Sequence, residues 1–162
     1  VRMSLEDQNE LCGLIRTGDP ARITTLLNKG NCDPNKRELK NYGLMSPFIA
    51  ACKNAQHADI IQAFLDYKRT DVTGEKWNSP LLAAIEYRND VAIDTLLKDD
   101  RIDPSETDFL RAFQAKDMKL IKKLASKAPI PVFDEGYVDQ DFLDKVREEV
   151  GVSRQKSARS AV

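Results

Sequence analysis

The chain lacks the features that would take it into a membrane or onto nucleic acid. No stretch of its 162 residues approaches the ~18 apolar residues of a membrane-spanning helix. Its 25 basic and 26 acidic side chains leave a net charge of −1, so no overall positive field attracts phosphate backbones or anionic lipids. We therefore expect a cytoplasmic protein that binds neither membranes nor nucleic acid.

Cysteine and histidine are too scarce to predict a metal site. Cys12, Cys32 and Cys52 form an odd set without a Cys-x-x-Cys pair, which argues against a disulfide framework and a structural zinc site. His57 is the only histidine, so no pair of histidine ligands exists. The glycines are isolated, which leaves no glycine-rich loop for a phosphate. We expect reduced thiols, no metal and no cofactor.

The composition favours helices. Apolar residues make up 41% of the chain and charged residues 31%, whereas aromatic residues make up only 7%. This balance allows a buried core under a strongly solvated surface and suits helices better than a β-sandwich or barrel. The length suits one compact domain or a few stacked repeats.

A short motif occurs twice, 33 residues apart. Residues 46–51 read Ser-Pro-Phe-Ile-Ala-Ala, and residues 79–84 read Ser-Pro-Leu-Leu-Ala-Ala. An amphipathic run follows each copy and ends in an apolar pair, and an aspartate stands six residues beyond each pair, at Asp71 and Asp103. Asp33 stands at the same distance from an earlier apolar pair. This self-similarity predicts four units, at about residues 5–33, 34–71, 72–103 and 104–126.

Each unit has the pattern of a helical hairpin. Phe48, Ala51 and Cys52 share one helical face, and residues 60–65 carry the apolar stripe of a second helix. Ser46 and Ser79 are predicted N-caps, because the proline that follows each is tolerated in a first helical turn. The alanine pairs in both motifs are small enough to let neighbouring helices approach closely.

These motifs resemble the ankyrin-repeat family, whose unit of about 33 residues starts Thr-Pro-Leu-His-x-Ala. The resemblance covers roughly residues 5–126 and implies an all-α solenoid of stacked helix-turn-helix units. Ile49 and Leu82 stand where the family has histidine. We expect that apolar contact replaces the hydrogen-bond link that this histidine makes between units.

The residues after the repeats predict a strap and a cap. Residues 127–151 hold closely spaced prolines, which exclude a helix at their start, and then an amphipathic segment that Asp139 caps and Gly151 ends. Residues 152–162 are small, polar and basic, so we expect a disordered tail. The final Ser160-Ala161-Val162 is similar to the carboxyl-terminal motif that PDZ domains capture, which is an alternative mode of binding.

The resemblance implies a function in binding another protein, because ankyrin proteins usually bind partners on the concave face. Its inner-helix positions here are Arg16, Lys53, Asn54, Glu86, Tyr87, Arg111 and Gln114. Its turn tips here include Arg37, Tyr42, Glu75, Lys76 and Trp77. Trp77 is the first candidate for an energetic hot spot, and the alternative is that it packs over the next hairpin.

Catalysis is not expected in this chain. A nucleophilic thiol needs a base within reach. His57 falls instead at the predicted turn between two helices, a place for helix capping, and Cys12 and Cys52 fall on predicted buried faces. We therefore predict a scaffold or adaptor. The alternative is a targeting domain of a larger multidomain enzyme, or of a pathogen effector that acts in a host cytosol, whose catalytic part lies elsewhere.

Overall fold

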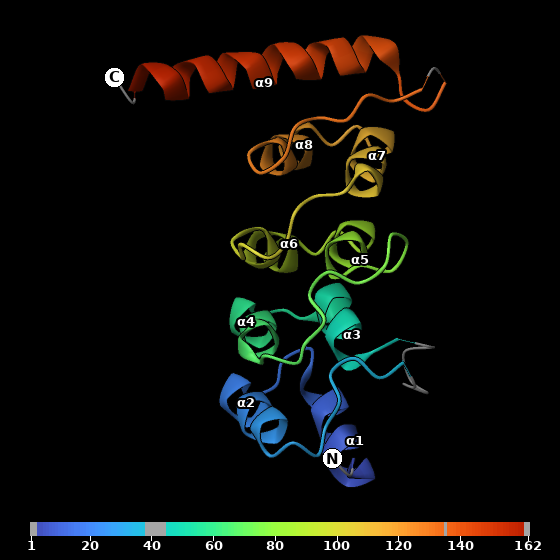
Figure 1. Cartoon of the computed structure of the whole chain (residues 1–162), viewed down its shortest axis with the longest axis vertical. Coiled ribbons are helices and arrows are strands. Elements are labelled where there is room, and N and C mark those ends of the chain that lie inside the picture. Colours follow the sequence, from blue (N-terminus) through green and yellow to red (C-terminus); the bar gives the residue numbers. More distant parts are fainter. Residues whose placement is uncertain (1–2, 38–44, 135, 161–162) are drawn as a thin grey trace. The chain divides into compact units, whose positions relative to one another are not determined.

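The computed structural model describes residues 3–37, 45–134 and 136–160, with only the backbone described for 152–160. Within these ranges every regular element is a helix, which confirms the predicted all-α class (Figure 1). The chain divides into two compact units, Val1–Ile102 and Asp103–Val162, which we call unit 1 and unit 2.

Unit 1 contains three helical hairpins. They are formed by α1 (Leu5–Leu14) with α2 (Pro20–Asn28), α3 (Pro47–Asn54) with α4 (Ala58–Asp66), and α5 (Pro80–Glu86) with α6 (Asp90–Leu97). Within this unit α1, α3 and α5 lie in one column and α2, α4 and α6 in a second (Figure 1). Helix α3 packs on α5, and α4 lies between α2 and α6. Each hairpin therefore buries its apolar faces against its neighbours.

The repeated motif starts α3 and α5 as predicted. The Ser46 hydroxyl accepts a hydrogen bond from the Ile49 N–H at 3.2 Å, and the Ser79 hydroxyl accepts one from the Leu82 N–H at 3.0 Å. A proline occupies the first turn of each helix. Both predicted caps are confirmed, and each is worth about 1 kcal/mol of stability.

The core of unit 1 lies between the two columns. Phe48 and Phe64 are buried, and their ring centroids lie 5.6 Å apart. The alanine pairs of α3 and α5 are buried as well, in accordance with the close packing of these helices. A fully buried Phe or Leu side chain contributes roughly 1.5–3 kcal/mol, which is more than a single helix cap contributes.

Polar contacts also join successive hairpins. The Asn89 side chain caps α6 and donates its amide to the carbonyls of Cys52 at 3.1 Å and Ala55 at 3.0 Å. The Gln56 N–H donates to the Arg16 carbonyl at 2.9 Å. The expectation of apolar contact in place of a hydrogen-bond link is therefore wrong for these hairpins, because Asn89 and the backbone supply hydrogen bonds between them.

The loops after α4 and α6 repeat the same backbone turn. The Thr70 N–H donates to the Tyr67 carbonyl, and the Ile102 N–H donates to the Asp99 carbonyl, both at 3.1 Å. Thr70 and Ile102 are both buried. Tyr67, Arg69 and Thr70 thus correspond in place to residues 99, 101 and 102.

Unit 2 contains α7 (Glu106–Gln114), α8 (Met118–Ala125) and α9 (Gln140–Ser160). Ser105 and Asp108 form a capping box at the start of α7. Helix α9 packs against α8, and the Phe113 ring makes edge-on contacts with Phe133 and Phe142, at centroid distances of 5.3 and 5.9 Å. Phe133 belongs to the non-helical strap, so an aromatic cluster ties the strap to the helices.

Helix α9 starts as predicted but does not end at Gly151. The Asp139 carboxylate accepts a hydrogen bond from the Phe142 N–H at 3.1 Å and so caps the helix. Gly151 lacks the positive φ of a helix-ending glycine, and the helix continues to Ser160. Residues 152–160, which we expected to be disordered, are helical. Five of these nine residues are Arg, Gln, Lys or Ala, which favour helix. Residues 161–162 lie outside the described residues.

Two turns inside hairpins place a non-glycine residue in the left-handed region. Arg88 after α5 and Lys116 after α7 both have φ of 50°. The same backbone hydrogen bond closes both turns, from Asn89 N–H to Ala84 O at 2.9 Å and from Asp117 N–H to Ala112 O at 3.1 Å. This is the Schellman arrangement, in which glycine is the preferred residue.

Candidate functional site

The structure brings two predicted binding residues together on neighbouring hairpins. Tyr87 caps the carboxyl end of α5, and its side chain is 54% exposed. The Lys53 ammonium, near the end of α3, lies 4.7 Å from the centroid of the Tyr87 ring. A cation over an aromatic face is attracted by the negative charge of the ring, at about 0.5–1 kcal/mol for an exposed pair. Packing of α3 on α5 thus creates an aromatic and cationic surface.

Trp77 lies at the tip of a short turn before α5. The turn is closed by the Asn78 N–H, which donates to the Glu75 carbonyl at 3.0 Å, so Lys76 and Trp77 are its central residues. The Trp77 side chain is 63% exposed, and the Lys76 ammonium lies 5.6 Å from its ring centroid. This exposure speaks against the alternative that Trp77 packs over the next hairpin.

The base of the Trp77 turn is firmly held. Gly74 has φ of +63°, and an added Cβ there would lie 2.6 Å from the Asn78 carbonyl oxygen, so only glycine fits. The Asp71 carboxylate accepts hydrogen bonds from the N–H groups of Gly74 at 3.0 Å and Thr73 at 3.2 Å. These donors, Gly74 first, lower the pKa of Asp71, and the positive charge of Arg37 lowers it further. The Trp77 indole is therefore presented on a preformed support.

The other predicted binding residues of unit 1 do not form a cluster. Arg37 is exposed and pairs with Glu75 at 3.8 Å. The Asn54 amide donates to the Ala50 carbonyl of its own helix at 2.9 Å, which reduces its freedom to bind a partner. Arg16 and Glu86 are exposed at the ends of α1 and α5. Tyr42 lies outside the described residues.

Two predicted residues belong to unit 2. Arg111 and Gln114 are exposed on α7, and the Arg111 guanidinium donates to the Gln114 side-chain oxygen at 3.1 Å. They form a local pair on one helix of unit 2.

The thiols and the histidine are poorly placed for chemistry. Burial raises the pKa of Cys12 to about 11 and also raises the pKa of Cys32 and Cys52, so all three remain neutral thiols near pH 7. His57 is exposed at the start of α4 and makes no side-chain capping hydrogen bond, so the expected capping role is wrong. Within the described ranges no three His, Cys, Asp or Glu side chains gather as metal ligands, and no helix could cross a membrane.

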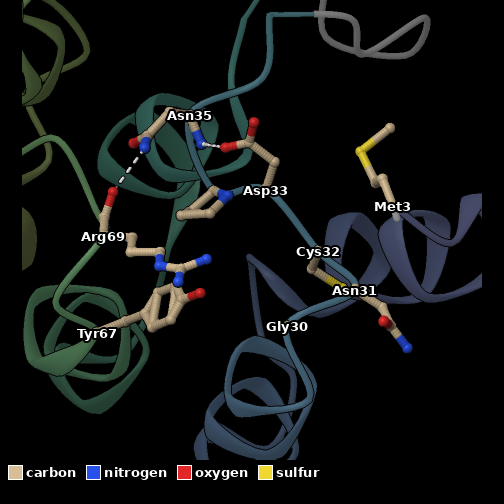
Figure 2. A pocket seen from close by; sticks show the side chains of 9 residues that line it. Met3, Gly30, Asn31, Cys32, Asp33, Asn35, Tyr67 and Arg69 are labelled. Carbon is tan, nitrogen blue, oxygen red and sulfur yellow. Dashed lines mark hydrogen bonds between the residues drawn. The ribbon is translucent and has the colours of Figure 1, made fainter. Parts of the chain in front are cut away.

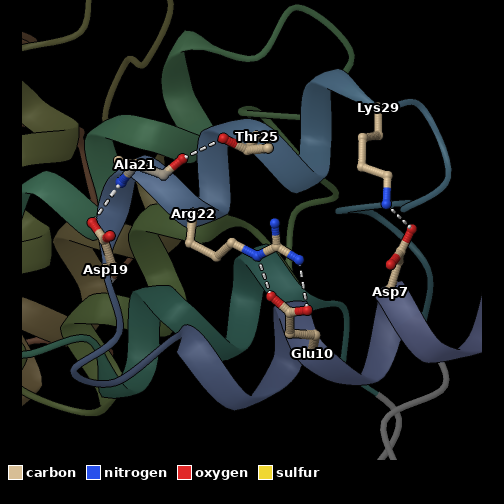
Figure 3. A network of polar contacts seen from close by, with 7 residues as sticks. All are labelled: Asp7, Glu10, Asp19, Ala21, Arg22, Thr25 and Lys29. Carbon is tan, nitrogen blue, oxygen red and sulfur yellow. Dashed lines mark hydrogen bonds and ion pairs between the residues drawn. The ribbon is translucent and has the colours of Figure 1, made fainter.

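A network of ion pairs on the first hairpin is structural. Arg22 forms a two-pronged pair with Glu10, and the Lys29 ammonium lies 3.1 Å from the Asp7 carboxylate, joining α2 to α1 (Figure 3). The hydrogen bonds from these cations lower the pKa of both carboxyls. Because these charges satisfy one another, the network leaves little for a ligand.

A pocket in unit 1 was not predicted from the sequence. It has a volume of about 400 Å³ and lies between the loops that follow α2 and α4 (Figure 2). Asp33, Tyr67 and Arg69 are among its lining residues. Aligning the two loops in the sequence could have indicated it, because Tyr67 stands where the loop after α6 has Asp99.

Comparison with known proteins does not place the chain in a family. No family model, curated protein or solved structure matches it.

Proposed function

We propose that the chain is an ankyrin-type scaffold that binds a partner protein through two exposed aromatic sites of unit 1, Tyr87 with Lys53 and Trp77 with Lys76. We call these two sites together the aromatic face. One observation carries the proposal: unit 1 leaves its tryptophan 63% exposed and Tyr87 54% exposed, each beside a lysine ammonium. Tryptophan and tyrosine are the side chains that most often dominate the energy of protein interfaces.

The local geometry favours binding because the face is preformed. Ordering side chains and loops on association costs about 0.5–1.5 kcal/mol per side chain. The turn under Trp77 is already fixed by Gly74 and by the hydrogen bonds to Asp71. Tyr87 is already held under Lys53. A partner would therefore meet aromatic side chains carried on an ordered backbone.

A binding role also suits the chemistry of the thiols better than catalysis does. The raised pKa values of Cys12, Cys32 and Cys52 keep the nucleophilic thiolate scarce near pH 7. The ankyrin-type reading rests on the repeated Ser-Pro start and on the stacked hairpins of unit 1.

The test compares alanine variants of three exposed aromatic residues. Immobilised wild type, Trp77→Ala, Tyr87→Ala and Tyr137→Ala would be exposed to cytosolic extract, and the retained proteins measured by quantitative mass spectrometry. Tyr137 is the control because it is 60% exposed but belongs to unit 2. We expect at least one protein that wild type and Tyr137→Ala retain equally and that the two other variants lose.

The retained protein would then be purified and titrated by calorimetry. A hot spot is worth at least ~2 kcal/mol, so Trp77→Ala should weaken the dissociation constant about thirtyfold. Recovery of the same proteins in the same amounts by all four chains would refute the proposal. Circular dichroism would confirm that each variant is folded.

A further inference from the structure

The pocket between the loops after α2 and α4 has a cationic side chain with no described partner. Figure 2 shows Arg69 and Tyr67 reaching from the α4 side toward the segment that carries Cys32 and Asp33. The Arg69 backbone carbonyl accepts a hydrogen bond, but within the described ranges its guanidinium makes no hydrogen bond or ion pair. We call this the Arg69 pocket.

Both walls of the Arg69 pocket are fixed. On the first wall, the Gln8 side chain donates to the Asp33 carbonyl and accepts from the Asp33 N–H, both at 2.8 Å. On the second, the Asn35 side chain donates to the Arg69 carbonyl at 2.7 Å and accepts from the Asp71 N–H at 2.8 Å. Asn35 also ties the two loops together. The pocket is therefore open to a ligand without rearrangement of the backbone.

The next hairpin shows how an arginine at this place is satisfied. Arg101 corresponds to Arg69, and its guanidinium donates twice to the Asp99 carboxylate, from Nε at 2.9 Å and from Nη2 at 2.7 Å. Nη2 also donates to the Leu65 carbonyl at 2.7 Å. At the position of Asp99, the earlier loop has Tyr67, which offers no carboxylate. The Arg69 pocket thus lacks the carboxylate that pairs with the corresponding arginine in the loop after α6.

We propose that the Arg69 pocket binds a carboxylate carried by an acidic peptide segment of a partner, and that this carboxylate takes the place of Asp99 on the Arg69 guanidinium. The planar fork of a guanidinium matches a carboxylate through two parallel hydrogen bonds. The Tyr67 hydroxyl lies in the same lining and is a further donor. The pocket shares no lining residue with the aromatic face, and the inference does not rest on the proposed function.

The charges of the lining favour a peptide carboxylate over a phosphate. Arg69 is the only cationic side chain of the described lining, and Asp33 adds a carboxylate. A doubly charged phosphate would be repelled by Asp33 and balanced by one cation alone, whereas a peptide carries one negative charge together with backbone N–H donors. The Asp33 carboxylate accepts from the Asn35 N–H at 2.8 Å and has further lone pairs for such donors. The volume of about 400 Å³ lies within the range of ligand sites.

The test uses the whole chain, labelled with ¹⁵N, and two peptides that differ only in charge. N-acetyl-Gly-Glu-Gly-amide and N-acetyl-Gly-Gln-Gly-amide would be titrated while backbone amide and arginine Nε–Hε signals are followed by NMR. We expect the glutamate peptide to shift the signals of Arg69 and of residues 30–35 to saturation, and the glutamine peptide to leave them unchanged. N-acetyl-Gly-Gly-Gly with a free carboxyl end would show whether a chain terminus is bound as well as a side chain.

Two variants remove the binding in different ways. Arg69→Gln deletes the guanidinium, and Tyr67→Asp installs the internal carboxylate found at Asp99, which should occupy Arg69. Each should weaken the glutamate peptide about tenfold or more, because charge-assisted paired hydrogen bonds are lost. Arg147→Gln, an exposed arginine of α9, is the matched control and should bind as wild type does.

Several outcomes would overturn the inference. They are equal shifts with the glutamine peptide, unchanged affinity in a folded Tyr67→Asp chain, saturation elsewhere on the protein, or tighter binding of inorganic phosphate than of the glutamate peptide. If Arg69→Gln fails to fold, Tyr67→Asp decides the matter alone, since it keeps every backbone hydrogen bond donor of the loop.

Discussion

The loops after α4 and α6 have the same backbone and different side chains. Tyr67, Arg69 and Thr70 in the first loop stand where the second has Asp99, Arg101 and Ile102. The second loop is internally complete, with a paired arginine and an apolar side chain in the core. The first leaves a guanidinium without a described partner and a buried hydroxyl, Thr70 Oγ1, without a hydrogen bond. Where two neighbouring hairpins share a backbone turn, such a difference between their side chains is expected at a place where stability is not the only requirement.

The largest effect should come from making the second loop resemble the first in its core. Ile102 is 4% exposed, so Ile102→Thr replaces a packed ethyl group with a buried hydroxyl. We expect a loss of about 2–3 kcal/mol in the free energy of unfolding. Chemical denaturation in urea would measure it. A loss below that of Ile102→Val, which keeps the site apolar, would show that the two loops tolerate a hydroxyl equally.

The two arginines should differ in their value to the fold. Arg101→Gln removes the paired hydrogen bonds to Asp99 and the bond to Leu65, and we expect a cost of about 1 kcal/mol after solvent screening. Arg69→Gln should change stability by less than ~0.5 kcal/mol, since no described contact of its side chain is lost. Thermal unfolding of both variants in the same buffer gives the comparison, and equal losses would contradict it.

A substitution of Thr70 should stabilise the fold. Thr70→Val has nearly the same shape and removes the buried hydroxyl that has no hydrogen-bond partner. We expect unfolding to cost about 1 kcal/mol more, because burying an unpaired polar group is unfavourable. Denaturant titration of Thr70→Val against Thr70→Ser separates the hydroxyl from the methyl group. A loss of stability in Thr70→Val would show that the hydroxyl has a partner.

Asp71 should give the smallest effect, and one that depends on pH. Hydrogen bonds from Gly74 and Thr73 lower its pKa in the folded state below the ordinary value of 3.8. Its contribution to stability is therefore present above that value and is lost as the pH falls through the lower, folded pKa. Asp71→Asn should be less stable than wild type at pH 7, with the difference shrinking below about pH 4. A difference that stays constant from pH 7 to acid would rule out this origin.

The sequence predicted the hairpins better than it predicted their surfaces. The Ser-Pro starts and the apolar stripes are local signals, and the caps by Ser46, Ser79 and Asp139 followed from them. The contact of Lys53 with Tyr87 depends on how α3 packs on α5, which no local pattern specifies. The interest of the Arg69 pocket lies in the carboxylate that the guanidinium lacks. This difference is seen only when the loop after α4 is compared with the loop after α6.

The end of α9 shows a different limit. Gly151 was a reasonable stop, because glycine weakens a helix by about 1 kcal/mol relative to alanine. Five of the nine residues after Gly151 favour helix, however, and the helix continues as far as Ser160. A single weak residue does not end a helix when its neighbours propagate it.

The left-handed turns at Arg88 and Lys116 allow the local opening of each hairpin to be measured by proteolysis. Both side chains are exposed and are the kind after which trypsin cuts. Trypsin needs an extended strand across its active site, and a turn closed by Schellman hydrogen bonds does not offer one. Cleavage after Arg88 or Lys116 must therefore await local opening of that hairpin. The rates of the two cuts would measure, separately for unit 1 and unit 2, how often each comes apart.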